Sequence, residues 1–111
     1  MEFTLHQHSH SVGIAALNGI VDVMSCHTLR QQIKQILQQG ITSLVLDLQA
    51  VKMIDNSALG TLKECLQMFR DRGGELALVH VTHQVDMKIR LLRLEAVFPI
   101  YTDVNVALKR L

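Results

Sequence analysis

The sequence predicts one α/β domain over residues 1–111, with a mainly parallel sheet of four to five strands, an antiparallel edge hairpin and about four helices. Two observations predict this class. Short runs of strand-forming residues alternate with stretches whose apolar residues recur every three or four positions, which gives the order β-β-α-β-α-β-α-β-α. The length is also near the commonest size of a single domain, and no linker, low-complexity stretch or internal repeat divides the chain.

The chain opens with a predicted hairpin. Apolar residues alternate with polar or small ones over residues 3–5 and 12–16, on either side of the polar stretch 6–11. Alternation of this kind is typical of strands that bury one face. We expect Asn18 and Gly19 to end the second strand, because this pair favours turns.

Three later segments carry apolar residues at helical spacing, and they are residues 24–39, 57–72 and 83–94. Gly40 follows the first segment and Gly73 the second, at the position where glycine commonly ends a helix. Asp103 is expected to cap a short last helix that extends through Leu108.

The parallel part of the sheet is predicted from apolar runs between these helices. Residues 43–48 are almost continuously apolar, which is typical of a central strand covered on both faces. Residues 75–81 form a second buried strand, and residues 100–101 form a short one after Pro99 breaks the chain. Helices that connect parallel strands imply right-handed crossovers.

Composition and charge argue against several function classes. The formal net charge of +1 comes from interspersed acidic and basic residues, so we expect no direct contact with nucleic acid. Cys26 and Cys65 stand apart in the sequence, which favours a reduced, cytoplasmic protein. No apolar run approaches the roughly 20 residues of a membrane-spanning helix, so we expect a soluble protein without direct membrane insertion.

Motifs for catalysis and metal binding are absent or weak. The sequence has no glycine-rich phosphate-binding loop, no GxGxxG after a strand and no GxSxG nucleophile elbow. Asp55 is the only base near Ser57, and an ionised carboxylate activates an alcohol weakly. His6, His8 and His10 alternate and could hold a metal on one strand face, but a solvated hairpin is the favoured interpretation. We predict a protein that is not an enzyme and needs neither metal nor cofactor.

Residues 44–62 carry the most informative pattern, L-V-L-D-L-Q-A-V-K-M-I-D-N-S-A-L-G-T-L. A buried strand gives way to a short polar crossing, an apolar pair and a helix start at Asp55, Asn56 and Ser57. These three residue types are ordinary helix N-caps. One interpretation is therefore that the segment begins a helix and has no further role. Asp47, at the expected strand end, is either a cap for the following loop or a carboxylate that touches the Ser57 site.

This segment resembles the signature of STAS domains, the family of bacterial anti-sigma factor antagonists, in which a hydrophobic-Asp-Leu strand precedes an Asp-Ser-Ser-Gly-Leu-Gly type helix start. Two flanks agree. Residues 17–22, L-N-G-I-V-D, resemble the turn after the family's second strand, and residues 94–108, which contain F-P-I-Y, resemble its C-terminal end. The resemblance covers nearly the whole chain and implies a STAS-like fold.

The resemblance also implies a phosphorylation switch. In the family, the serine just before the glycine of the motif is phosphorylated by a partner kinase, and Ser57 stands at this position. Asn56 stands where the family often has Ser or Thr, which leaves one hydroxyl, and Ala58 stands where it often has Gly. The implied partners are an anti-sigma factor with serine kinase activity and a serine/threonine phosphatase that restores the unmodified form.

The implied partner-binding surface comprises Asp22, Asp55, Asn56, Ser57, Ala58, Leu59 and Gly60, together with the rest of the turn at residues 18–22. A phosphate on Ser57 would add about −1.5 to −2 charge at a helix N-terminus, which tolerates an anion. A docked partner would not tolerate it, so we expect release without unfolding.

Two other functions stay open at this point. The chain can be a non-phosphorylated STAS subunit of a larger complex, such as a lipid-transport ABC system or a signalling scaffold, and Ala58 favours this reading. It can also be a nucleotide- or metabolite-binding module, because a helix N-terminus can hold a phosphate directly.

Overall fold

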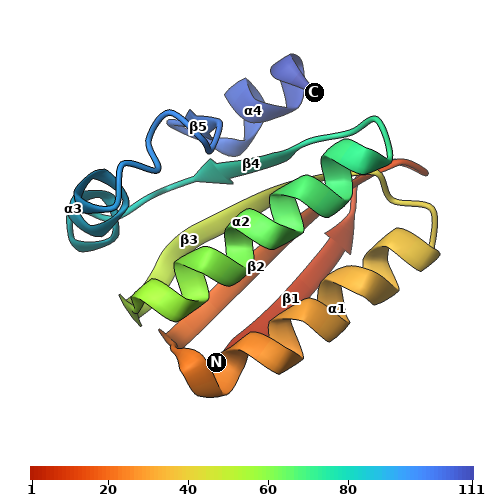
Figure 1. Ribbon diagram of the computed structural model, residues 1–111. Coiled ribbons are helices and arrows are strands. Elements are labelled where there is room, and N and C mark those ends of the chain that lie inside the picture. The colour runs from red at the N-terminus through yellow and green to blue at the C-terminus, as the bar shows by residue number, and fades with distance from the viewer.

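The computed structural model describes residues 1–111 and contains one five-stranded sheet with the strand order β1-β2-β3-β4-β5 (Figure 1). The elements are β1 (Glu2–Gln7), β2 (Val12–Val21), η1 (Val23–Ser25), α1 (Cys26–Gln38), β3 (Ser43–Ile54), α2 (Asn56–Asp71), β4 (Leu76–Val79), α3 (His83–Leu91), β5 (Ile100–Tyr101) and α4 (Val104–Arg110). β1 pairs antiparallel with β2, and every other pair is parallel. The predicted α/β class, the element order and the antiparallel edge are confirmed.

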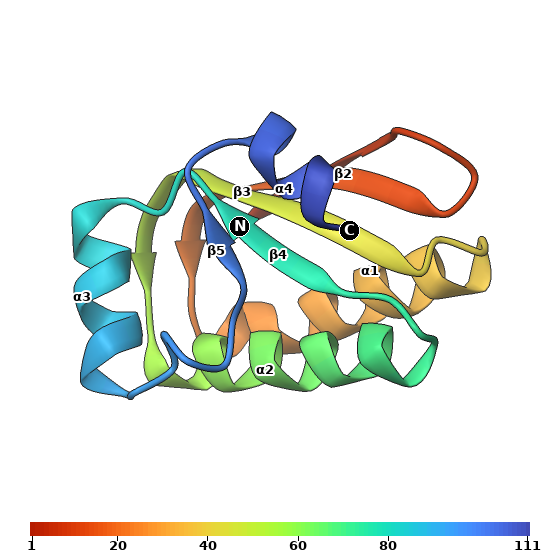
Figure 2. The same ribbon diagram turned by 90° about the horizontal axis from the view of Figure 1, so that it is seen from above.

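The helices lie on both faces of the sheet (Figure 2). α1 and α2 cover one face, because successive crossovers of the same hand place their helices on the same side. A cluster of 25 buried residues fills the space between this face and the helices, with Phe69 of α2 among its largest members. α4 covers the other face over a cluster of four buried residues, Val45, Ala77, Val79 and Ala107.

The helix ends follow local chemistry. Gly40 after α1 has a φ of +90° and Gly73 after α2 has a φ of +79°, conformations that glycine adopts without strain. Gly74 is required for another reason, since a Cβ there would lie 1.7 Å from the carbonyl oxygen of Thr42. Thr82 and Asp103 cap α3 and α4 by accepting backbone hydrogen bonds from Val85 and Val106, and α4 extends to Arg110.

Two predicted boundaries are wrong. β2 does not end at Asn18 and Gly19 but continues to Val21, with register shifts against β3 on both sides of this pair. β3 does not end near Asp47 but continues through the expected polar crossing to Ile54. The two extensions pair with each other, so each provides backbone hydrogen-bond partners for the other. Neither sequence on its own indicates a strand.

Smaller differences concern the ends of three elements. β1 extends to Gln7 and so takes in His6, which was expected in the turn. β4 is limited to four residues, and α3 ends at Leu91, two residues before Arg93 adopts a φ of 58°. A left-handed residue there stops the helix before Leu94, where the apolar spacing had suggested its end.

Candidate functional site

Asp55 fixes the start of α2. It follows directly on β3 and takes an extended backbone conformation as the N-cap residue. Its Oδ1 accepts a hydrogen bond from the amide of Ala58 at 2.9 Å, and its Oδ2 accepts one from the amide of Val23 at 3.1 Å. The Asp55 amide donates to the carbonyl of Val21 at 3.1 Å. One residue thus caps the helix and holds the chain segment after β2 beside it.

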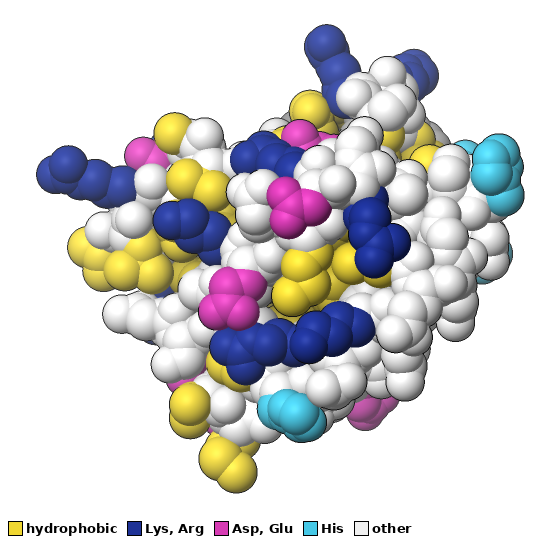
Figure 3. Space-filling view, turned by 45° about the vertical axis from the view of Figure 1, so that its right-hand side comes forward, with side chains coloured by type: hydrophobic (Ala, Val, Ile, Leu, Met, Phe, Trp, Pro, Cys, Tyr) yellow, Lys and Arg dark blue, Asp and Glu magenta, His cyan; other side chains and the backbone are white.

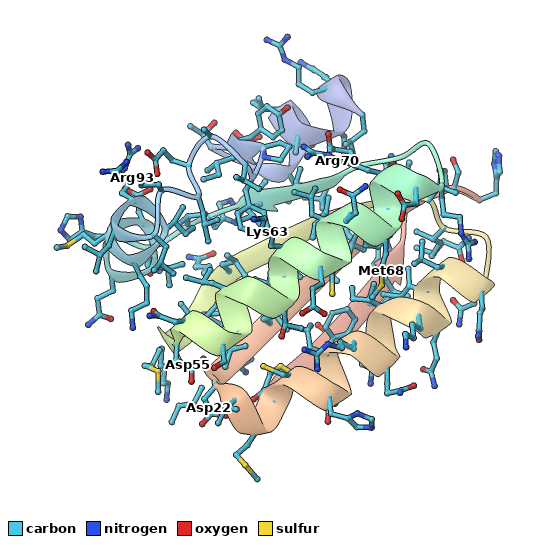
Figure 4. All side chains as sticks on the ribbon, in the orientation of Figure 1. Asp22, Asp55, Lys63, Met68, Arg70 and Arg93 are labelled. Carbon is cyan, nitrogen blue, oxygen red and sulfur yellow. The ribbon has the colours of Figure 1, made fainter.

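Asp22 fixes that neighbouring segment. It is the N-cap of η1, and its Oδ1 accepts a hydrogen bond from the amide of Met24 at 3.0 Å. The Asp22 side chain accepts from the Ser25 amide and the Ser25 hydroxyl accepts from the Asp22 amide, which together form a capping box. Figure 4 shows Asp22 and Asp55 close together at the ends of the molecule where α1 and α2 begin. The structure therefore brings the two predicted aspartates into one site.

Asn56 and Ser57 occupy the first two positions of α2, and both are exposed. Ser57 lies on the first helical turn, directly after the N-cap Asp55 and Asn56. Its carbonyl accepts a hydrogen bond from the Thr61 hydroxyl at 3.1 Å, one turn further along. A hydroxyl on this first turn is accessible to a reagent or a partner. It also lies at the positive end of the helix dipole.

Three further residues of the predicted surface differ in exposure. Ala58 and Leu59 are fully buried at 0% exposure, so their side chains belong to the core and support the surface from beneath. Gly60 is exposed, and a Cβ added to it would meet nothing within 4 Å. The sequence pattern could not separate these cases, because residues 58–60 follow one another on a helix whose buried face is set by the sheet.

Exposed apolar side chains lie around this site. They are Ile20, Val23, Met24 and Met53, with exposed fractions of 49%, 62%, 85% and 43%. The expected contact surface included the turn at residues 18–22 and hence Ile20, but it missed the other three. Ile20 and Met53 are register partners in β2 and β3, and Val23 is the residue bonded to Asp55. Hydrophobic side chains protrude at the lower left of Figure 3, where α1 begins. Such clustering is typical of a protein-binding surface.

The sequence does contain a signal for these residues, which is an interruption of the apolar–polar alternation near the end of β2. In β2, Ile20 and Val21 are both apolar although only Val21 faces the core, and Val23 and Met24 follow within the next three positions. A strand with one buried face ordinarily alternates apolar with polar residues. We name the set Ile20, Val23, Met24 and Met53 the apolar rim.

A small cavity of about 170 Å³ opens between the end of β3 and α3. It is lined by Lys52, Met53, Ile54, Gln84, Val85 and Lys88. Met53 belongs both to this lining and to the apolar rim, and Ile54 directly precedes Asp55. The two lysines of the cavity therefore place positive charge on the flank of the apolar rim. This volume is below the roughly 300–1,000 Å³ of ordinary small-molecule sites.

Asp47 lies elsewhere. It is in the middle of β3, where its Oδ2 lies 3.1 Å from Nδ1 of His80 and its Oδ1 accepts a hydrogen bond from the amide of Gln49 at 2.9 Å. The expectation that it ends a strand is wrong, because β3 continues past it to Ile54. His80 has a φ of 52° directly after β4, so this hydrogen-bonded pair lies where the chain turns away from the sheet.

The remaining candidates for metal binding do not converge. His6 lies in β1, whereas His8 and His10 lie in the hairpin turn, so the three do not share one strand face. No three His, Cys, Asp or Glu side chains in the chain are grouped so as to hold a metal ion. Cys26 and Cys65 are buried and unpaired, and burial raises the pKa of the Cys65 thiol to about 12. None of the helices is both long and apolar enough to cross a bilayer.

Comparison with known proteins agrees with this architecture. Residues 5–107 match the model of the STAS domain family. An anti-sigma F factor antagonist of Paenibacillus polymyxa is 27% identical over 106 residues, which cover 95% of this chain and 91% of that protein.

Solved structures show the same fold. The anti-sigma factor antagonist SpoIIAA in its unphosphorylated form has a TM-score of 0.82 at 17% identity, over 98% of this chain and 95% of its own. An anti-sigma factor antagonist of Mycobacterium paratuberculosis has a TM-score of 0.83 at 23% identity, over 98% and 93%. A sulfate transporter family protein of Wolinella succinogenes has a TM-score of 0.75 at 18% identity, over 89% and 83%. With its family model, sheet order and helix start at Asp55 all in agreement, the chain belongs to the STAS domain family.

Proposed function

We propose that this chain is an anti-sigma factor antagonist that binds an anti-sigma factor with serine kinase activity and releases it when Ser57 is phosphorylated. One observation carries the proposal. The exposed Ser57 stands on the first turn of α2, and Asp55 fastens Val23 of the apolar rim beside that turn through a 3.1 Å hydrogen bond. An exposed hydroxyl and an exposed apolar surface therefore lie close together, as the proposed switch requires.

The geometry supports a switch in which binding and modification exclude each other. Apolar groups such as Val23 and Met24 gain free energy when a partner covers them, by about 25 cal/mol for each Å² removed from water. A phosphate on Ser57 would have to lose its hydration in the same contact, and an unpaired buried charge costs far more than this gain. The carboxylates of Asp22 and Asp55 lie at the same end of the helices and add repulsion.

The phosphorylated protein should keep its fold. The amides at the start of α2 and the helix dipole favour an anion by about 0.3–1 kcal/mol, which offsets part of the repulsion from Asp55. Because the module is intact after release, a serine/threonine phosphatase can return it to the binding form by hydrolysing the phosphate. The switch therefore acts on the partner contact alone.

The first experiment combines mass spectrometry with a binding assay. Protein from its own organism is mapped for phosphopeptides, and candidate kinase-type anti-sigma factors are tested for binding to wild type, Ser57→Ala and Ser57→Asp. We expect phosphate on Ser57, retained binding by Ser57→Ala and at least tenfold weaker binding by Ser57→Asp. Ser9→Asp, in the exposed hairpin turn, is the control for added charge and should bind like wild type.

Two results would reject this proposal. If Ser57→Asp binds as tightly as Ser57→Ala, charge at this position does not control the contact. If Ser57 stays unmodified during growth and stress while a partner still binds, the chain is instead a constitutive STAS subunit that uses the same surface without phosphorylation.

A further inference from the structure

β1 leaves one edge of the sheet open. Its six residues pair with β2 on one side only, and all but Phe3 are exposed. Native edge strands commonly carry lysine, proline or a bulge that prevents pairing with another chain. β1 reads E-F-T-L-H-Q and has none of these, and its pairing with β2 runs without a register shift. The opposite edge, β5, has only two residues and directly follows Pro99.

The sequence of β1 is complementary to itself in one antiparallel register. With a twofold axis at Thr4, Thr4 lies opposite its own copy, Glu2 lies opposite His6 and Phe3 lies opposite Leu5. The Glu2 carboxylate can accept a hydrogen bond from the His6 imidazole, and the Phe3 ring can cover Leu5. Cross-strand side-chain pairs of this kind stabilise an antiparallel strand pair.

Neighbouring registers lose this match. An axis at Leu5 would set Phe3 opposite Gln7, and an axis at Phe3 would set Glu2 opposite Thr4. An axis between two residues is incompatible with a regular antiparallel ladder, because it would set residues of opposite faces, such as Phe3 and His6, directly across from each other. Only the register centred on Thr4 keeps both apolar residues together and gives the carboxylate a donor.

The exposure of Leu5 fits the same register. Leu5 lies opposite Ala15 of β2, a core residue, and so faces the side of the sheet that carries α1 and α2. It is nevertheless 37% exposed, which shows that no helix of its own chain closes this part of the edge. A second copy related by the axis at Thr4 would bring its Phe3 over Leu5 on that same face.

We propose that β1 is an interface for a second copy of this chain, which pairs antiparallel about a twofold axis at Thr4 and joins the two five-stranded sheets into one. The interface lies on the outer edge of β1, whereas the apolar rim lies at the ends of β2 and β3 and after β2. Ser57 is not part of this interface, whereas the N-terminal end of β1 borders the apolar rim, since Met1 lines the same surface hollow as Ile20 and Met24. A contact of six residues is small, so the dimer should depend on protein concentration.

Disulfide trapping tests the register. The two native cysteines are buried, with the pKa of Cys65 raised to about 12, so an added surface thiol is the one that reacts. Under mild oxidation, Thr4→Cys should form a disulfide-linked dimer, because the two thiols face each other at the axis. Glu2→Cys and His6→Cys should each stay monomeric, since each thiol lies about 14 Å along the strands from its own copy. A mixture of the two should form a crosslinked pair.

Analytical ultracentrifugation without added cysteines provides a second measurement. Leu5→Lys should abolish the concentration-dependent rise in mass, because a charge at the edge blocks pairing. Val106→Lys on α4 is the matched control, since Val106 is 38% exposed, and it should associate like wild type. Equal crosslinking of the three single-cysteine variants, or association that survives Leu5→Lys, would overturn the proposal. So would a wild type that stays monomeric up to millimolar concentration.

Discussion

Asp55 and Val23, 32 positions apart in the sequence, are joined by a hydrogen bond of 3.1 Å from the Val23 amide to Oδ2 of Asp55. The other carboxylate oxygen caps α2 through Ala58 at 2.9 Å. The helix that carries Ser57 and the segment that carries Val23 are therefore positioned by the same side chain. Changes at Asp55 should affect stability and partner binding together.

Replacing Asp55 by alanine should lower the free energy of unfolding by roughly 2–3 kcal/mol, because the helix loses its N-cap and the Val23 amide loses a charged acceptor. Asp103→Ala is the matched control. Asp103 caps α4 through Val106 in the same way but makes no second contact of this kind, so its loss should cost about 1 kcal/mol. Urea unfolding measures both variants, and equal costs would show that the bond to Val23 contributes nothing.

Gly60→Ala should stabilise the free protein by about 0.5–1 kcal/mol, since the position is inside α2 and an added Cβ meets no neighbour. The same variant should bind the partner more weakly if the partner's backbone approaches this glycine. Gly74→Ala is the opposite case and should destabilise by roughly 1–3 kcal/mol or more, because its Cβ would collide with Thr42. Thermal unfolding and titration with the partner separate the two effects.

Glu64 should titrate below the ordinary range of a glutamate. The guanidinium of Arg30 donates to Oε2 at 2.9 Å, and this hydrogen bond lowers the pKa of the Glu64 carboxyl. A carboxyl whose pKa is lower in the folded protein than in the unfolded chain stabilises the fold when the pH is above the pKa of the unfolded chain. This contribution is lost as the pH falls through the pKa of the folded protein. NMR titration should show the Glu64 pKa rising to its ordinary value in Arg30→Gln. An unchanged pKa would show that the pair does not persist in solution.

The Cys65 thiol should be inert at neutral pH. Burial raises its pKa to about 12, so almost no thiolate is present to attack a disulfide reagent. Met24→Cys, at a position that is 85% exposed, should react at least a hundredfold faster in the folded protein. In denaturant all thiols should react alike. Fast labelling of Cys65 in the native protein would mean that α2 opens readily.

Alkaline pH should weaken the fold through the same thiol. The unfolded chain releases the Cys65 proton near the ordinary thiol value of 9, whereas the folded protein retains it up to about 12. Stability is therefore complete below the unfolded value and falls as the pH rises between the two. The fall should be smaller in Cys65→Ala, which has no proton to release there, although burial makes that variant less stable at neutral pH.

Much of the fold could be predicted because apolar spacing reports which face of each element is buried. The helix capped by Asp55 was found in this way, whereas the short strand after Pro99 was found from the break at that proline. The second halves of β2 and β3 were not predicted, since they contain polar residues such as Asn18 and Lys52. These residues belong to the sheet because the two segments pair with each other. Such pairing is a property of two segments together.

The site was predicted only in part for a similar reason. Asp22 and Asp55 lie far apart in the sequence. They were assigned to one surface because of the resemblance to a family, since the local pattern around each gives no such indication. The burial of Ala58 and Leu59 depends on how α2 packs on the sheet. The exposure of Val23 and Met24 depends on how the chain leaves β2, and this is set by the bond to Asp55.

The strand order of the sheet has a consequence for how the protein is made. Each strand lies next to the one that precedes it in the sequence, so no strand must wait for a later one to fill a gap between its neighbours. A chain that leaves the ribosome N-terminus first can form the β1–β2 hairpin and then add β3, β4 and β5 one at a time at a single growing edge. The residues of the surface around Ser57, which end at Gly60, all precede β4, the last strand and the last helix in the chain.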